Sequence, residues 1–125
     1  MRIERSIDIE DAVRQALADH LTAYCRPLPK DYSLPCILVS KVGGTDRDKI
    51  DTFEVVLDSR AATEYEADLT LRNAIGILKA VDDTAIRYVT VNSSGSWGSD
   101  PARPDLALCT ARLRVVAHLE NATID

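Results

Sequence analysis

The chain has 125 residues, of which 46% are hydrophobic and 28% charged, with a formal net charge of −5. Its length predicts a single domain spanning residues 1–125, with a core that needs neither disulfides nor a metal. The negative balance argues against a nucleic-acid-binding module, because neutralising phosphates takes a surplus of clustered Lys and Arg. No apolar run approaches membrane-spanning length, so we expect no membrane contact. Three cysteines without a CxxC spacing predict buried, reduced thiols.

The N-terminal part of the chain predicts an amphipathic helix followed by a connector. Apolar residues recur at helical spacing from Ile9 through Leu17 and Leu21 to Tyr24, which predicts about four turns. Asp8 is placed to cap the first turn. The segment 26–35 contains three prolines, which fix dihedrals and remove donors, so it is expected to be extended.

Two strands joined as a hairpin are expected next. The fairly apolar run 36–42, CILVSKV, ends at Gly43-Gly44, and the polar segment GGTDRDK predicts a loop. Phe53, Val55 and Leu57 then alternate with polar residues, which is the pattern of a strand with one buried face.

A long helix is expected after this strand. Its apolar residues follow spacings of three and four and form one stripe. The stripe consists of Ala67, Leu71, Ala74, Ile75, Leu78 and Val81. Thr63 and Glu66 fit a capping box, although Ser59 could cap an earlier turn. Asp68 and Arg72 are spaced to pair on the solvent side.

The last third of the chain predicts two more strands. Residues 86–91, IRYVTV, are rich in β-branched and aromatic residues. The segment from Asn92 to Asp105 has no apolar period and is expected to be a protruding loop. Residues 107–119 alternate over the longest stretch. The predicted fold is α+β in the order αββαββ, with two helices on one face of a four-stranded antiparallel or mixed sheet.

The chemistry-bearing residues show no catalytic pattern. Neither His20 nor His118 has a metal-ligand partner at a suitable spacing, and no phosphate-binding loop is present. Cys36 or Cys109 could meet His118 in the fold, but thiols within strand patterns are usually buried and inert. We therefore expect no catalytic, cofactor or metal site. On the exposed sheet face, Glu54 is expected to pair with Arg112 or Arg114.

Two features predict a contact surface instead. Tyr65, Leu69 and Gly76 lie away from the core stripe of the long helix, so its outer side is incompletely polar. Trp97 lies in a Gly/Ser-rich segment, where it either folds back on the core or anchors a partner. The candidate interface residues are Gly43, Gly44, Asp46, Arg47, Asp48, Lys49, Tyr65, Leu69, Gly76, Trp97 and Arg103.

With this order of elements, the chain resembles the tail terminator, or tail completion, proteins of tailed bacteriophages. The similarity covers most of the chain and lies in pattern more than motif. It rests on the N-terminal helix, PCILVSKVGGTDRDK with its glycine turn, DTFEVVLDSRAATEYEA leading into the long helix, and the late strand ending RLRVVAHLE.

The resemblance implies a structural virion protein without cofactor. It implies a homo-oligomeric, typically hexameric, ring that caps the tail tube, stops its polymerisation and offers a surface for joining the head. The implied partners are the tail tube protein and head or neck connector proteins, with DNA crossing the lumen without specific binding. The acidic balance suits such a channel. Alternatives are another neck component, such as a head-closure or head–tail joining protein, and a small α+β enzyme or ligand-binding regulator.

Overall fold

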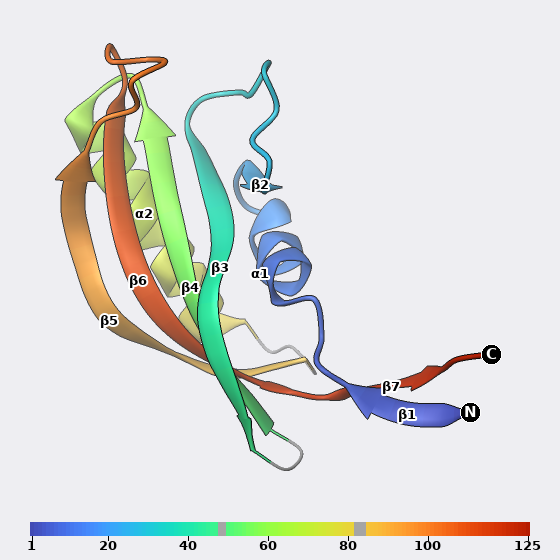
Figure 1. The fold of residues 1–125 in the computed structure, drawn as a ribbon. Helices are drawn as coiled ribbons and strands as arrows, with labels where there is room; N and C mark the ends of the chain where they lie inside the picture. Colours follow the sequence, from blue (N-terminus) through green and yellow to red (C-terminus); the bar gives the residue numbers. More distant parts are fainter. Residues whose placement is uncertain (48–49, 82–84) are drawn as a thin grey trace.

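The computed structural model describes residues 1–47, 50–81 and 85–125, and for residues 46 and 47 the backbone alone. The described chain is an α+β fold with two helices, a five-stranded mixed sheet and a separate two-stranded sheet (Figure 1). The elements are β1 (Arg2–Arg5), α1 (Ile9–Ala18), β2 (Ala23–Cys25), β3 (Cys36–Arg47), β4 (Ile50–Ala61), α2 (Glu64–Ala80), β5 (Ile86–Gly98), β6 (Ala107–His118) and β7 (Glu120–Thr123).

The main sheet has the order β2-β3-β4-β6-β5, in which β2 pairs parallel and every other pair is antiparallel. The four strands that the sequence predicts are present. The predicted order αββαββ is nevertheless incomplete, because the sheet has a fifth strand, β2, and β1 and β7 form a sheet of their own. These three strands have three or four residues each, too few to show an alternating pattern.

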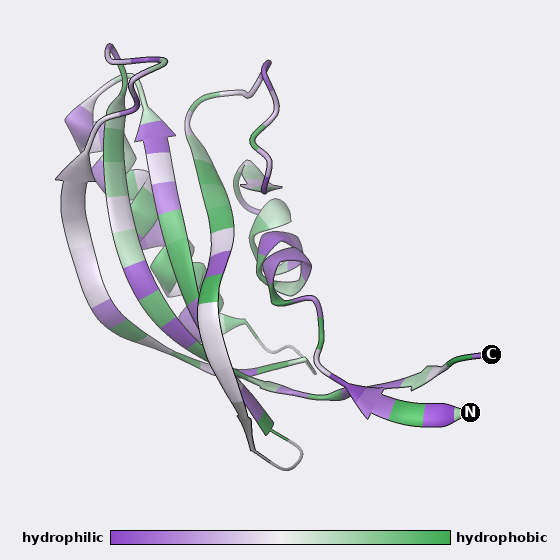
Figure 2. Cartoon of the chain, viewed as in Figure 1, coloured by the Kyte–Doolittle hydropathy of each residue, from purple (hydrophilic) through white to green (hydrophobic). Residues whose placement is uncertain are grey.

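The core lies between the five-stranded sheet and both helices. Phe53, Val55 and Leu57 of β4 face it, and Val55 is paired in register with Leu113 of β6. Figure 2 shows the resulting alternation of hydrophobic and hydrophilic residues along β4 and β6. On the opposite face, the Arg112 guanidinium lies 3.4 Å from the Glu54 carboxylate, which confirms the expected cross-strand pair.

Helix α1 begins as predicted but ends earlier. The Asp8 side chain accepts a hydrogen bond from the Asp11 N–H at 3.2 Å, so it is the N-cap. The helix stops at Ala18, whereas the apolar spacing predicts helix through Tyr24. Tyr24 belongs to β2 and is paired with Leu38, because the strand beside it supplies backbone partners that the spacing rule cannot anticipate.

Helix α2 agrees closely with its predicted pattern. The Thr63 hydroxyl accepts from the Glu66 N–H at 3.2 Å, which confirms Thr63 as the cap. The alternative cap, Ser59, is buried and donates to the Ala67 carbonyl at 2.8 Å. Arg72 and Asp68 form the expected pair at 2.9 Å.

The residues of the stripe expected to pack on the sheet are mostly buried. Ala67, Leu71, Ala74 and Leu78 are fully buried, while Ile75 and Val81 are half-buried at the margin. Each fully buried leucine contributes about 1.5–3 kcal/mol to folding through the removal of apolar surface from water.

The loop predicted from Gly43 onward is wrong, because β3 continues through Arg47 in a ladder with β4. The composition misleads here: a bulge between Lys41 and Gly43 shifts the register, and the glycines are part of the strand. A Cβ on Gly44 would lie 2.8 Å from the Thr52 carbonyl oxygen, so glycine is required where the two backbones approach. Residues 48 and 49 lie outside the description.

The loop predicted from Asn92 to Asp105 is wrong over its first half. Residues 92–98 extend β5 and pair with β6, with register shifts between Val91 and Ser93 and between Ser93 and Ser96. Gly95 takes a positive φ of 83°, which suits glycine at such an irregularity. The turn proper is confined to residues 99–105 (Figure 1).

Strands β1 and β7 form a ribbon that projects away from the body of the protein (Figure 1). Arg2 is paired with Thr123, and Arg5 with Glu120. The Met1 amine donates to the Ile124 carbonyl at 2.8 Å, and the Ile124 N–H donates to the Met1 carbonyl at 2.9 Å. The ribbon therefore brings the two ends of the chain together.

Candidate functional site

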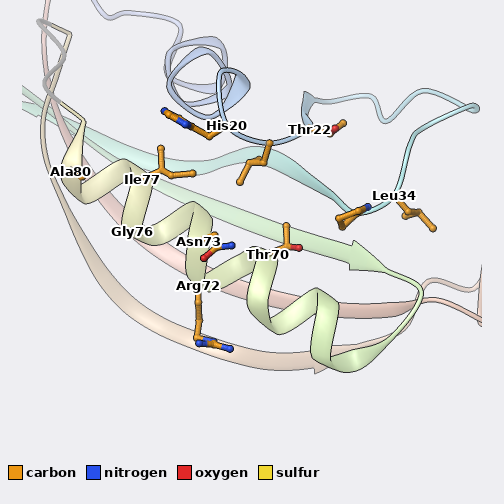
Figure 3. A pocket seen from close by; sticks show the side chains of 11 residues that line it. His20, Thr22, Leu34, Thr70, Arg72, Asn73, Gly76, Ile77 and Ala80 are labelled. Atoms are coloured by element: carbon orange, nitrogen blue, oxygen red, sulfur yellow. The ribbon is translucent and has the colours of Figure 1, made fainter.

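An open groove of about 750 Å³ lies between α2 and the segment that follows α1 (Figure 3). Both sides contribute apolar residues to its lining, and five of the eleven lining residues are polar. The lining residues are His20, Leu21, Thr22, Leu34, Pro35, Thr70, Arg72, Asn73, Gly76, Ile77 and Ala80. The groove is open at Gly76, since a Cβ built there would meet nothing within 4 Å.

The groove can bind but has no reactive pair. Its lining contains no carboxylate and no thiol, and the Arg72 guanidinium is already paired with Asp68 at 2.9 Å. The Asn73 amide and the threonine hydroxyls can donate and accept hydrogen bonds without being acids or bases near neutral pH. His20 is the one imidazole in the lining.

The cysteines lie where a thiolate is disfavoured. Cys36 and Cys109 are fully buried, and burial raises the pKa of each thiol; the nearby Asp68 carboxylate also raises that of Cys109. Burial likewise raises the pKa of the half-buried Cys25. These shifts keep the thiols protonated and poorly nucleophilic.

The structure keeps both strand cysteines away from His118. Cys109 and His118 are nine residues apart along β6, which corresponds to roughly 30 Å. Cys36 lies at the same end of the sheet as Cys109, because it pairs with Arg60, which pairs with Leu108. Neither thiol can reach the His118 imidazole.

Strand β5 is an edge of the main sheet and carries two exposed aromatic side chains. Trp97 is paired with Cys109 and is 51% exposed, so it is neither a core residue nor on a free loop. Tyr88 is 57% exposed on the same strand. The half of β5 from Asn92 to Gly98 is exposed throughout.

The candidate residues on α2 divide between two surfaces. Gly76 lines the groove, whereas Tyr65 and Leu69 lie outside it. Tyr65 is 73% exposed at the start of the helix, and Leu69 is half-buried. Tyr65 and Gly76 are therefore exposed on different parts of α2, and Leu69 is only partly exposed.

The remaining candidate residues lie at opposite ends of the sheet. Gly43, Gly44, Asp46 and Arg47 belong to the far end of β3, and Asp48 and Lys49 lie outside the described residues. Arg103 is in the turn of residues 99–105 and pairs with the Asp105 carboxylate at 3.1 Å.

The turn of residues 99–105 is held by its own hydrogen bonds and by the body. The Arg103 N–H donates to the Asp100 carbonyl at 3.0 Å, and the Ala102 N–H donates to the Asp100 carboxylate at 2.9 Å. The largely buried Arg60 guanidinium lies 3.8 Å from the same carboxylate. Asp100 therefore ties the turn to the end of β4.

Asp51 is a buried carboxyl group that sequence reasoning missed. It is 2% exposed, and neither carboxylate oxygen has a hydrogen-bond partner among the described residues. It lies beside Gly44 and Lys41 at a small hollow of about 280 Å³. The signal was available, because extending the alternation back from Phe53 places Asp51 on the buried face.

Neither a comparison with protein-family models nor one with curated proteins finds a match to this chain. Within the described ranges, neither helix is long and apolar enough to cross a bilayer. In the same residues, no three acidic, cysteine or histidine side chains gather as metal ligands would.

Proposed function

We propose that the protein is a structural virion subunit that resembles a phage tail terminator and acts by self-association. It forms a ring, typically hexameric, that caps the tail tube, stops its polymerisation and presents a joining surface to head and neck connector proteins. The observation that carries this proposal is the open edge of β5 with Trp97 half-exposed on it. Tryptophan in such a position is a typical interface anchor.

The distribution of exposed aromatics supports a partner surface. Tyr65 on α2 and Tyr88 and Trp97 on β5 are each more than half exposed. Tyr and Trp are enriched at interfaces because they bury a large area with few rotatable bonds. A chain with no association would leave three of its six aromatic side chains in water.

The chemistry of the described residues favours a role without catalysis. The thiols are buried and protonated, and the groove lining offers no acid–base pair. The net charge of −5 suits a ring through which DNA passes, since a surplus of cations would hold the phosphates.

Trp97→Ala tests the proposal. The wild-type protein is expected to have a multimeric mass by light scattering and to show rings by negative-stain microscopy. The variant should keep the melting temperature of the subunit within a few degrees while its association weakens by about 2 kcal/mol or more. A monomeric wild-type protein at high concentration would contradict self-association, and an unfolded variant would show that Trp97 stabilises the subunit instead.

The groove favours ligand binding as a second candidate function. Gly76→Leu would fill its open side, and leucine is preferred over glycine in a helix, so folding should not suffer. A ligand-binding role predicts a small molecule that raises the melting temperature of the wild-type protein and leaves that of the variant unchanged. A ring subunit requires no such molecule.

A further inference from the structure

One face of the β1–β7 ribbon is apolar toward the tip of the ribbon. Because side chains alternate along a strand, Met1 and Ile3 share this face with Ala122 and Ile124, and the ion pair of Arg5 and Glu120 lies on the same face nearer the body. Met1 and Ile124 are exposed, and Ile3 and Ala122 are half-buried. The other face carries Arg2, Glu4, Asn121 and Thr123.

The ribbon is incomplete as a structural unit. Each strand has four residues, and among the described residues the two pair with each other and with no third strand. An isolated two-stranded ribbon is marginal in water, because it has neither a second layer nor a further strand to satisfy its outer backbone groups. Pairing with a strand of another sheet would satisfy the outer backbone groups of the ribbon and stabilise it.

The edge of β5 offers the complementary surface. Natural sheets usually blunt a long edge with proline, with charge, with bulges or by covering it, and in residues 92–98 of β5 only the irregular register between Val91 and Ser96 acts in that way. Residues 92–98 contain no proline and no charged side chain, and all seven are exposed. Their outer backbone groups can accept an added strand, as in β-augmentation.

The two surfaces cannot meet within one chain. Residues 92–98 pair with the early half of β6, down to Leu108, whereas the ribbon begins after His118. That separation is roughly 30 Å along β6, and the ribbon points away from the body on the side opposite this half of β5 (Figure 1).

We infer that the β1–β7 ribbon of one copy adds to the edge of residues 92–98 of the next copy. This inference rests on the proposed self-association and names the contact that carries it. It joins two different surfaces on opposite sides of the subunit, which is a heterologous interface, and such interfaces close into rings when the rotation per subunit allows. Residues 92–98 carry no charge, so they repel neither the Arg nor the Glu side chains of the ribbon. In the extended sheet, side chains of the added ribbon strand would lie beside Trp97, which is on this segment, and reduce its exposure.

Paired cysteines test the contact directly. Ser94→Cys places a thiol on the β5 edge, and Thr123→Cys places one on the ribbon, both at exposed positions. Cys25→Ser removes the half-buried native thiol, and Cys36 and Cys109 are buried with raised pKa values. A short bifunctional maleimide should join the double variant into a ladder of covalent multimers and leave either single variant unjoined.

The outcomes separate the inference from the proposed function when the mass of each sample is measured alongside. A multimeric mass without a ladder would overturn the ribbon contact and leave self-association standing. A dimer from Ser94→Cys alone would instead show symmetric β5–β5 pairing and also overturn it. A monomeric mass would refute self-association itself, and the contact with it.

A substitution on the ribbon supplies a second readout. Ile3→Asp puts a charge on the apolar face, which must be desolvated in the contact, and should weaken association roughly tenfold or more. Asn121→Asp adds the same charge on the opposite face and should leave association within about twofold. Equal effects of the two changes would contradict an apolar contact through this face.

Discussion

The two edges of the five-stranded sheet are built differently. The β2 edge has three residues and lies beside α1, whose Glu10 accepts from the Arg26 guanidinium just past β2 and from the Lys41 N–H of β3 at 2.9 Å. The β5 edge has thirteen residues, and no strand of the described chain pairs with its outer side.

The ladders on the two sides of the sheet also differ. On the β2 side, the β3–β4 register shifts once, between Lys41 and Gly43, whereas on the β5 side the β5–β6 register shifts three times. The β2 side, packed against α1, is the closed side of the sheet, and the β5 side, with exposed Tyr88 and Trp97, is the open side. We expect the closed side to contribute more to stability than the open side.

The largest expected effect comes from the core that both sides share. Leu71→Ala or Leu78→Ala removes a fully buried side chain of α2 and leaves a cavity, which should lower the free energy of unfolding by about 2–5 kcal/mol. Urea denaturation measures this loss. Unchanged stability in both variants would contradict the placement of α2 on the sheet.

A pair of glycines compares the two sides directly. Gly44→Ala on β3 forces its Cβ against the Thr52 carbonyl and should cost about 1–3 kcal/mol. In Gly98→Ala on β5, the nearest atom is a Leu108 methyl at an ordinary 3.7 Å, so the cost should stay below about 1 kcal/mol. Melting temperatures check both, and a larger loss at Gly98 would break the comparison.

The smallest expected effect concerns the hydrogen bonds by which Glu10 of α1 holds the β2 edge of the sheet. Burial alone would raise the pKa of Glu10. The hydrogen bonds from Arg26 and Lys41, with the charge of Arg26, lower this pKa by more than burial raises it, so it lies below its ordinary value. A lowered pKa means that Glu10 stabilises the fold above its unfolded pKa, and this contribution is lost as pH falls through the folded pKa.

Glu10→Gln should therefore lower stability by about 1 kcal/mol at neutral pH and by less in acid. Denaturation midpoints at neutral pH and near pH 3 test the difference. Glu64→Gln, on the exposed first turn of α2, is a matched control with an expected loss of about 0.3 kcal/mol. If the loss of stability in Glu10→Gln were larger in acid than at neutral pH, the lowered pKa of Glu10 would be contradicted.

Local rules predicted the elements whose partners are close in sequence. The Thr63 cap, the α2 stripe and the Asp68–Arg72 pair follow from spacings of three and four, so they were found correctly. The alternation of Phe53, Val55 and Leu57 predicted β4 for the same reason.

The errors occurred where a distant neighbour decides the structure. Gly43, Gly44 and residues 92–98 have the composition of a loop, yet β4 and β6 hold them as strands through bulges. Tyr24 fits a helical period but pairs with β3. The groove and the open edge depend on how these strands pair. The sequence therefore indicates Gly76 and Trp97 as contact residues but not the surfaces to which they belong.

The ribbon also imposes an order on folding. Its Met1 and Ile124 are separated by 123 positions, so pairing β1 with β7 closes the longest loop in the described chain. Loop closure loses entropy as separation grows, and non-local pairings form late. We therefore expect the ribbon to form after the main sheet and the helices have folded, so that an incompletely folded chain lacks it. If copies associate through the ribbon, only fully folded chains can then join the assembly.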